Sequence, residues 1–271
     1  MTNQNVKVKM DKSQYISNFD NLILNSVTRK IYGQQEFFNV GYWYSNTQSQ
    51  EEACLNLLEK LLDFIPQKRG NILDVGSGLG ATANYLLKYY LSTDVVGINI
   101  SSQQIERSRV NAPKCKFICM DATQMEFEDN SFDNIICVEA VFYFDTRAKF
   151  IQEAWRVLKP GGHLILSDII FDNTEHFGDW IVSPENIVKE KNIKDYKKIY
   201  QQVGFENLEF VEATETCWLK HFRYLKSWME EEFKVGEVDE QTYQLNVNAI
   251  DGLLRSSSID YLLVSAKKPV K

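Results

Sequence analysis

Between residues 72 and 170, two kinds of hydrophobic pattern follow one another in regular alternation. Short runs in which nearly every residue is apolar, such as 95–98 and 135–138, are followed by longer stretches with apolar residues at helical spacing. Strands that are apolar on both faces are typical of a buried parallel sheet, and the intervening helices indicate right-handed crossovers. We therefore predict five successive strands, at Ile72–Val75, Asp94–Ile100, Lys116–Met120, Phe132–Val138 and His163–Ile170.

The chain before these strands has a different pattern. Residues 14–32 and Gln50–Ile65 carry apolar side chains at helical spacing, and the aromatic segment Phe37–Tyr44 lies between them. These helices have no evident place in the sheet. We predict that residues 1–66 form an N-terminal helical lid and that residues 67–271 form the core.

The alternation also breaks down after the fifth strand. Residues 171–193 form an irregular insertion, and residues 214–257 contain two further helical patterns. Long insertions beside a rigid scaffold often carry function, so we predict that both add to the lid. A helix at Asp195–Val203 and strands at Glu206–Ala213 and Ile259–Ala266 complete the predicted core.

A glycine-rich turn follows the first predicted strand. It reads Asp74-x-Gly76-x-Gly78-x-Gly80, which indicates a strand that turns sharply into a helix and leaves bare backbone for a ligand. Gly76-x-Gly78-x-x-Ala81 also satisfies the dinucleotide fingerprint. Asp74 favours another ligand, because a pyrophosphate prefers helix amides without a carboxylate beside them, whereas a positively charged ligand welcomes one.

Every predicted parallel strand ends in a polar residue. Any one of these residues could simply cap a strand end. Because ligands of open parallel sheets bind at the carboxyl ends of the strands, five such residues in register indicate one shared site. They are Asp74, Asn99, Asp121, Glu139 and Asp168.

Taken together, these segments resemble the successive motifs of the class I S-adenosylmethionine (SAM) methyltransferases. The likeness extends over about residues 35 to 170, and it is carried by Asp74–Gly80, Val96–Ser101, Met120–Ala122, Ser131–Ile136 and Leu158–Gly162. It implies a Rossmann-like α/β fold with seven mostly parallel strands and an antiparallel last strand. Val40-Gly41-Tyr42-Trp43 resembles the small-molecule branch, which modifies sugars, polyketides, tocopherol-like phenols, sterols and isoprenoid diphosphates.

The resemblance also implies how SAM, and its product S-adenosylhomocysteine (SAH), would be held. The glycine loop and Asp74 would bind the methionine end, Asp121 and Ala122 the adenine, and Asn99 the ribose. Asn99 departs from the acidic residue that is most common there, and Gln104 is placed to compensate. Tyr42 and Trp43 would cover the cofactor, or else belong to an aromatic core. The full set of candidates for the cofactor is Tyr42, Trp43, Asp74, Gly76, Ser77, Gly78, Asn99, Ile100, Gln104, Asp121, Ala122, Val138 and Glu139.

Methyl transfer to a hydroxyl group also needs alignment, dry surroundings and a base. Many O-methylating relatives have a histidine where Tyr143 stands, and a tyrosine is a poor base near neutral pH. Asp168 matches an acidic position used by some relatives, so we prefer it over Tyr143 for proton removal. His176, in the first insertion, is a third candidate. For His163 and His221 a structural role is favoured.

Composition narrows the choice of partners. The 271 residues carry a formal charge of −7, which argues against binding to a nucleic-acid backbone. The N-terminus has no apolar signal core and no run reaches the length of a membrane helix, so we expect a cytoplasmic protein without membrane contact. The five cysteines suit a reducing compartment and do not form a zinc pattern, so we expect no metal.

The predicted function is methyl transfer from SAM to a small natural-product acceptor, with a hydroxyl group preferred. C- or N-methylation of an isoprenoid or polyketide, and methylation of a macromolecule, stay as alternatives. An NAD-dependent oxidoreductase is disfavoured by Asp74 and Asp121, and a cofactor-binding module without chemistry is not excluded by the fold. The high aromatic content, 13%, suits either a packed core or an aromatic acceptor pocket. The sequence leaves the acceptor and the oligomeric state open.

Overall fold

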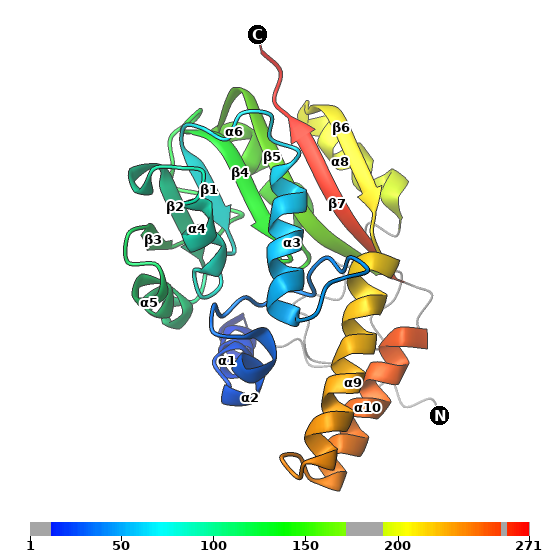
Figure 1. The fold of residues 1–271 in the computed structure, drawn as a ribbon. Helices are drawn as coiled ribbons and strands as arrows, with labels where there is room; N and C mark the ends of the chain where they lie inside the picture. Colours follow the sequence, from blue (N-terminus) through cyan, green and yellow to red (C-terminus); the bar gives the residue numbers. More distant parts are fainter. Residues whose placement is uncertain (1–11, 172–191, 256–258, 271) are drawn as a thin grey trace, which may run out of the picture.

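A seven-stranded sheet forms the centre of the computed structural model, which describes residues 12–171, 192–255 and 259–270 (Figure 1). The strand order is β3-β2-β1-β4-β5-β7-β6. Neighbouring strands from β1 to β5 pair in parallel, and β7 lies antiparallel between β5 and β6. The predicted mostly parallel sheet with an antiparallel last strand is therefore confirmed. The strands are β1 (Ile72–Val75), β2 (Val95–Asn99), β3 (Lys116–Cys119), β4 (Phe132–Val138), β5 (Leu158–Phe171), β6 (Glu206–Glu212) and β7 (Ile259–Lys267).

The order of the strands reverses between β1 and β4. From β1 the chain moves outward through β2 to β3, and then returns to the other side of β1 to form β4. This reversal leaves a crevice beyond the carboxyl ends of β1 and β4, which is where open α/β sheets bind their ligands. One predicted boundary differs, because β5 begins at Leu158 and not at His163: the Lys159–Gly162 turn joins the ladder, with the Gly161 N–H donating to the Lys268 carbonyl.

Helices cover both faces of the sheet. On one face lie α3 (Gln50–Leu62), α4 (Ala81–Leu86) and α5 (Ser102–Asn111); on the other lie α6 (Arg147–Val157) and α8 (Ile193–Val203). The apolar stripe of α3 is fully buried against the sheet, so this helix belongs to the core although it falls within the predicted lid segment 1–66. Ser49, Ser101 and Thr146 cap α3, α5 and α6 by accepting a backbone N–H.

Two short helices, α1 (Lys12–Ile23) and α2 (Ser26–Tyr32), lie below the ends of the strands in the view of Figure 1. The helical spacing over residues 14–32 is interrupted at Asn25, whose carbonyl accepts the Arg29 N–H as the second helix begins. Asparagine favours such a helix start because its side chain competes with the helical backbone.

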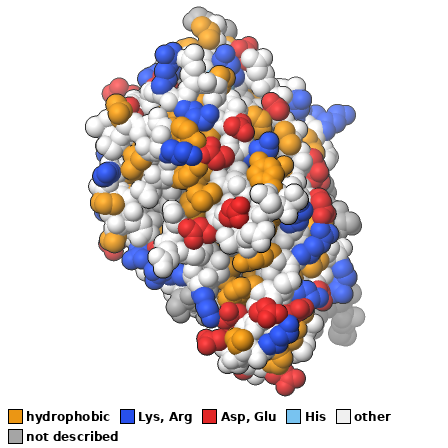
Figure 2. Space-filling view, viewed as in Figure 1, with side chains coloured by type: hydrophobic (Ala, Val, Ile, Leu, Met, Phe, Trp, Pro, Cys, Tyr) orange, Lys and Arg blue, Asp and Glu red, His pale blue; other side chains and the backbone are white. Residues whose placement is uncertain are grey.

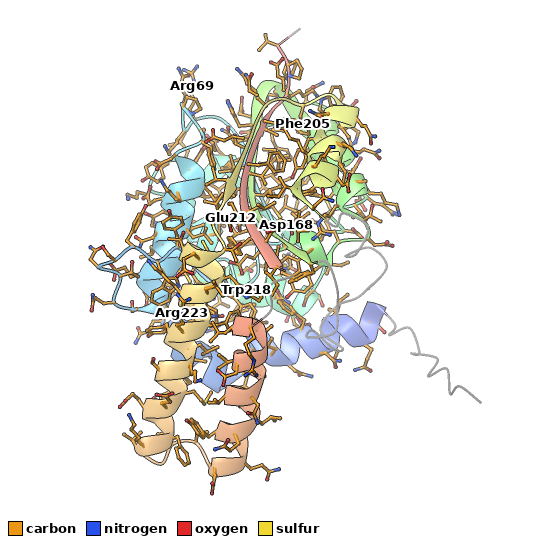
Figure 3. The ribbon with its side chains drawn as sticks, turned by 90° about the vertical axis from the view of Figure 1, so that its right-hand side faces the viewer. Arg69, Asp168, Phe205, Glu212, Trp218 and Arg223 are labelled. Atoms are coloured by element: carbon orange, nitrogen blue, oxygen red, sulfur yellow. The ribbon has the colours of Figure 1, made fainter. Side chains whose placement is uncertain are left out.

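The second predicted insertion forms a helical hairpin. A π-helical turn at Glu215–Leu219 leads into α9 (Lys220–Lys234), which packs against α10 (Glu240–Arg255), and Figures 1 and 3 both show the pair extending away from the sheet. Lys30 of α2 forms an ion pair of 2.5 Å with Glu232 of α9, so the N-terminal helices and the hairpin are in contact. Most of the first insertion, residues 171–193, lies outside the described residues.

Candidate active site

A cavity of ≈ 290 Å³ lies at the strand reversal, beyond the carboxyl ends of β1, β2, β3 and β4. Helix α1 contributes Ile16, Phe19 and Ile23 to its wall. The structure therefore brings strand ends and an N-terminal helix together around one cavity. Of the residues proposed from the sequence, the cavity is lined by Gly76, Ser77, Gly78, Asn99, Ile100, Gln104, Asp121, Ala122, Val138, Glu139 and Tyr143.

The glycine loop is held against β2. The N–H groups of Gly76 and Ser77 both donate to the Ile98 carbonyl, at 2.9 and 3.0 Å. Gly76 has a φ of 71°, and a Cβ atom there would lie 2.4 Å from Cβ of Ala140. At Gly78 a Cβ would meet only Ile23, at 3.9 Å, so this part of the loop is open toward the cavity. The loop thus presents bare backbone to a ligand, as the sequence predicted.

Asp74 lies buried beneath this loop and does not belong to the cavity lining. Its carboxylate accepts the Ala83 N–H in the first turn of α4, while Oδ2 has no partner among the described residues. Burial raises the pKa of Asp74 to about 7. Oγ of Ser77, which does line the cavity, is a second buried polar atom without a described partner. Ser77 Oγ is therefore available to a ligand in the cavity, whereas Asp74, proposed from the sequence to bind the cofactor, lies behind the loop and would act on a positively charged ligand such as SAM only through its charge.

The end of β2 carries a hydrogen-bonded pair of amides. Asn99 Nδ2 donates to Gln104 Oε1 at 2.9 Å, and Asn99 Oδ1 accepts the Ser101 N–H at 3.0 Å. A carboxylate joins this pair from helix α1, because Asp20 accepts from Gln104 Nε2 at 2.7 Å and from Ser101 Oγ at 2.8 Å. The acidic group missing from the β2 end is therefore present nearby, although it comes from a distant part of the chain.

The ends of β3 and β4 complete the polar side of the cavity. Asp121 is held by Thr123, whose N–H and Oγ1 donate to its Oδ1 at 2.8 and 2.7 Å. Glu139 has a φ of 50° and accepts at Oε1 from the Tyr261 hydroxyl, at 2.6 Å, and from the Val40 N–H, at 2.9 Å. Although both hydrogen bonds favour the ionised carboxylate, burial outweighs them and raises the pKa of Glu139 to about 7.

Aromatic side chains form much of the remaining wall. They come from the segment after α2 and from the segment after β4, so they face the cavity from two sides of the fold. Such a wall suits the apolar body of a small acceptor. These residues are Phe37, Phe38, Phe142, Tyr143 and Phe144.

The structure does not support proton removal by Asp168. Figure 3 labels Asp168 within the sheet. Its carboxylate is fully buried in β5 and forms an ion pair of 2.8 Å with Nε of Arg147, and its other oxygen accepts the Ile169 N–H. Asp168 is absent from the cavity lining because it serves as the counterion of a buried arginine.

The other two candidates for the base fare differently. Tyr143 does line the cavity, but burial and the neighbouring Glu139 raise its pKa far above the ordinary value, so it is a hydrogen-bonding group and not a base. His176 lies outside the described residues. Of the remaining histidines, His221 is buried, its Nδ1 lies 2.8 Å from Gln50 Oε1, and burial lowers its pKa to about 3, which fits the structural role expected for it.

Tyr42 and Trp43 do not cover the cavity. The Tyr42 N–H donates to the Ala53 carbonyl on α3, and Trp43 is buried with its ring 4.6 Å from that of Tyr224 on α9. Neither residue belongs to the cavity lining, so of the two expectations the aromatic core fits the structure. Gly41 explains the placement: its φ of 76° and its close approach to Ala53 turn the segment onto α3.

Three observations bear on the partners expected from the sequence. Within the described ranges, His, Cys, Asp and Glu side chains form no group of three that could hold a metal ion. No helix in the described part of the chain combines the length and apolar character of a membrane span. On the face shown in Figure 2, Lys and Arg side chains are interspersed with Asp and Glu.

Sequence reasoning missed two features of this site. Asp20 was overlooked, although an acidic residue between the apolar positions Phe19 and Ile23 of a predicted helix is a detectable signal. Glu139 was assigned to the cofactor alone, and only the fold places it beside Tyr261, far along the chain.

Known proteins resemble this chain in sequence and in fold. Residues 73–166 match the family described as Methyltransferase domain. An O-methyltransferase of Pyrenophora dematioidea is 30% identical over 193 residues, which cover 65% of this chain and 70% of that protein. The 27-O-demethylrifamycin SV methyltransferase of Amycolatopsis mediterranei is 26% identical, with 84% and 89% covered. In fold, phosphoethanolamine N-methyltransferase 2 of Haemonchus contortus, solved with SAH, has a TM-score of 0.74 at 20% identity, with 94% of this chain and 60% of that chain covered.

Proposed function

Because the chain belongs to the class I SAM-dependent methyltransferases, we propose that it transfers a methyl group to a hydroxyl group of a small natural product with an aromatic or otherwise apolar body. SAM is the cofactor, and a small-molecule acceptor is supported by the rifamycin and phosphoethanolamine methyltransferases that this chain resembles, which are named for small-molecule acceptors. The choice of a hydroxyl group rests on one observation: a carboxylate with a pKa of about 7, that of Glu139, lines the cavity next to an aromatic wall.

The residues of the cavity divide between the two ligands. The glycine loop, the Asn99–Gln104 pair and Asp121 would hold SAM, which supplies a methyl group on a positively charged sulfur. The aromatic side chains after α2 and β4 would hold the acceptor and exclude water from it. Both ligands would then meet at the end of β4.

Glu139 would act as the base. Tyr261 and Val40 both donate to Oε1, whereas Oε2 receives no hydrogen bond from the described residues. Oε2 would accept the proton of the acceptor hydroxyl as the new oxygen–carbon bond forms. A base with a pKa near the working pH is well suited to this task, and Tyr261 would keep its carboxylate oriented.

N- or C-methylation of a neutral acceptor is a second candidate. The cavity wall offers several aromatic ring faces, and such faces stabilise the positive charge that develops on an amine nitrogen as it is methylated, or on the carbocation formed by C-methylation. In these reactions Glu139 would contribute charge and not proton transfer in the methylation step.

The test is incubation with methyl-labelled SAM and a metabolite extract, together with protein and RNA, from the source cells. Gly78→Arg is the control, since Gly78 has a φ of 50° and an arginine there would enter the cavity. Label in a small product whose mass spectrum places the methyl group on oxygen supports the proposal. Label on nitrogen or carbon favours the second candidate, and label on macromolecules contradicts both.

A further inference from the structure

The inner face of helix α1 is apolar except for one acidic residue. Ile16, Phe19, Asp20 and Ile23 lie three and four positions apart, so they share the helix face that is turned toward the cavity. Asp20 is only 2% exposed to solvent. A buried carboxylate is costly unless its oxygens are hydrogen-bonded, so its place on this face calls for specific partners.

Both partners of Asp20 lie at the start of α5, where Ser101 is the N-cap and Gln104 belongs to the first turn. Oδ2 accepts from the Ser101 hydroxyl at 2.8 Å, and Oδ1 accepts from Gln104 Nε2 at 2.7 Å. Among the described residues, no Lys, Arg or His forms an ion pair with Asp20. Its charge is therefore directed at the start of α5 and not at a cation.

This contact determines how two side-chain amides are oriented. An amide can present either its oxygen or its nitrogen, whereas a carboxylate only accepts hydrogen bonds. Asp20 therefore requires the nitrogen of Gln104, which turns Gln104 Oε1 toward Asn99 Nδ2. The oxygen of Asn99 is then left for the Ser101 N–H. Each amide oxygen keeps a second lone pair that can accept a hydroxyl proton.

We infer that Asp20 is a positioning residue for the ribose of the cofactor: through Gln104 and Asn99 it presents two acceptors to the ribose hydroxyls. Helix α1 supplies from a distance the negative charge that the end of β2 lacks. The inference rests on the proposed placement of the ribose at Asn99. It makes α1 part of the cofactor site, in addition to the part it takes in covering the cavity.

The test compares two ligands, SAH and its 2′,3′-dideoxy analogue, by calorimetric titration. In Asp20→Asn the new amide can donate to Gln104, so Gln104 no longer has a single orientation. We expect SAH to bind about tenfold more weakly to this variant, because its ribose hydroxyls lose a charge-assisted hydrogen-bond network. Binding of the analogue should change less than about twofold, because it has no ribose hydroxyls to use that network. Gln104→Ala should give the same selective loss, and the double variant should lose no more than either single one.

Two controls separate positioning from packing. Asn21→Ala alters the exposed side of the same helix and should leave both affinities unchanged. Glu36→Gln weakens the other anchor of this region, the bidentate ion pair with Arg107 on α5, and should weaken both ligands alike.

Other outcomes would overturn the inference. Equal losses for SAH and the analogue in Asp20→Asn would mean that Asp20 only packs α1, and unchanged SAH binding would mean that it does not act on the site. Additive losses in the Asp20→Asn and Gln104→Ala double variant would show that the two residues act independently. In each case the proposed methyl transfer would stand, whereas failure of the wild-type protein to bind SAH would overturn both.

Discussion

At the scale of single residues, two carboxylates share the same cause of a raised pKa but have different roles. Asp74 and Glu139 end neighbouring strands, and burial raises the pKa of each to about 7. Asp74 accepts a hydrogen bond from the backbone at the start of α4 and lies below the cavity, whereas Glu139 lines the cavity. Because of this difference in position, Glu139 is the candidate base, whereas Asp74 would act on a bound positive charge only through its own charge.

Replacing Glu139 by Gln should lower kcat by about 10²–10⁴-fold, the usual contribution of a general base. In the wild type the base works only when ionised, so kcat should fall as the pH drops below about 7. Tyr261→Phe removes a hydrogen bond that favours the ionised carboxylate, so this fall should begin at a higher pH. The pH profile of kcat checks both statements, and a Glu139→Gln enzyme with undiminished kcat would rule out the assigned role.

Replacing Asp74 by Asn should stabilise the ligand-free protein at pH 8. The folded-state pKa of about 7 lies above the ordinary 3.8, so the ionised carboxylate opposes folding increasingly as the pH rises between those values. The asparagine oxygen can still accept the Ala83 N–H. We expect a gain of about 2–4 kcal/mol in the free energy of unfolding at pH 8, from roughly 1.4 kcal/mol per pKa unit, and almost none near pH 4.

Urea unfolding at the two pH values measures this gain. Glu128→Gln, at an exposed carboxylate, is the control and should change little at either pH. A gain that does not depend on pH would show that the charge of Asp74 is not its cause. The same Asp74→Asn variant should bind SAM more weakly, since the orphaned Oδ2 would lose its charge.

At the scale of secondary-structure elements, the sheet was the most predictable part. β1 and β4 have the bounds that the sequence predicted, because buried parallel strands are apolar on both faces and end abruptly in polar turns. Of the five polar strand ends, Asn99, Asp121 and Glu139 do line the cavity. Asp168 was misplaced because the sequence does not reveal Arg147 beside it, and Asp20 was missed because its contact with Gln104 joins elements far apart in the chain.

It should be possible to move the negative charge of this network from Asp20 on α1 to position 99 at the end of β2. Asn99→Asp alone removes the Nδ2 donor to Gln104 and adds a second carboxylate to the Asp20 network, so SAH binding should weaken about tenfold or more. Adding Asp20→Asn returns the network to one negative charge, now at the end of β2, and should recover most of the affinity. Titration with SAH checks this, and a double variant weaker than either single one would contradict it.

At the scale of the whole molecule, a rigid sheet is joined to a covering layer made of early residues. Asp20 and Glu36 both attach this layer to α5, and Lys30 attaches it to α9. Buried clusters on both faces hold the sheet, and aromatic packing adds to the polar contacts of the cover, with Phe37 in the core and Phe19 against Tyr143. A ligand in the cavity would touch both parts at once.

Ligand binding should therefore slow amide hydrogen exchange in α1 far more than in the sheet. We expect added SAH to increase protection over residues 12–23 and 76–80, because both segments contact the cavity. The outer part of the α9–α10 hairpin serves as an internal reference and should not change. Exchange measured by mass spectrometry tests this, and an unchanged α1 would mean that the helix does not belong to the cofactor site.

Helix α1, which covers the cavity, also bears on the turnover rate of the enzyme. Ile23 faces the open side of Gly78, and Asp20 fastens the same helix at Ser101 and Gln104, so α1 is held as a latch over the part of the cavity proposed for the cofactor. If release of SAH requires this latch to open, the rate at which α1 opens, and not the chemical step, sets the turnover number. Variants that loosen α1 would then bind SAM less tightly and yet cycle faster when the cofactor is abundant.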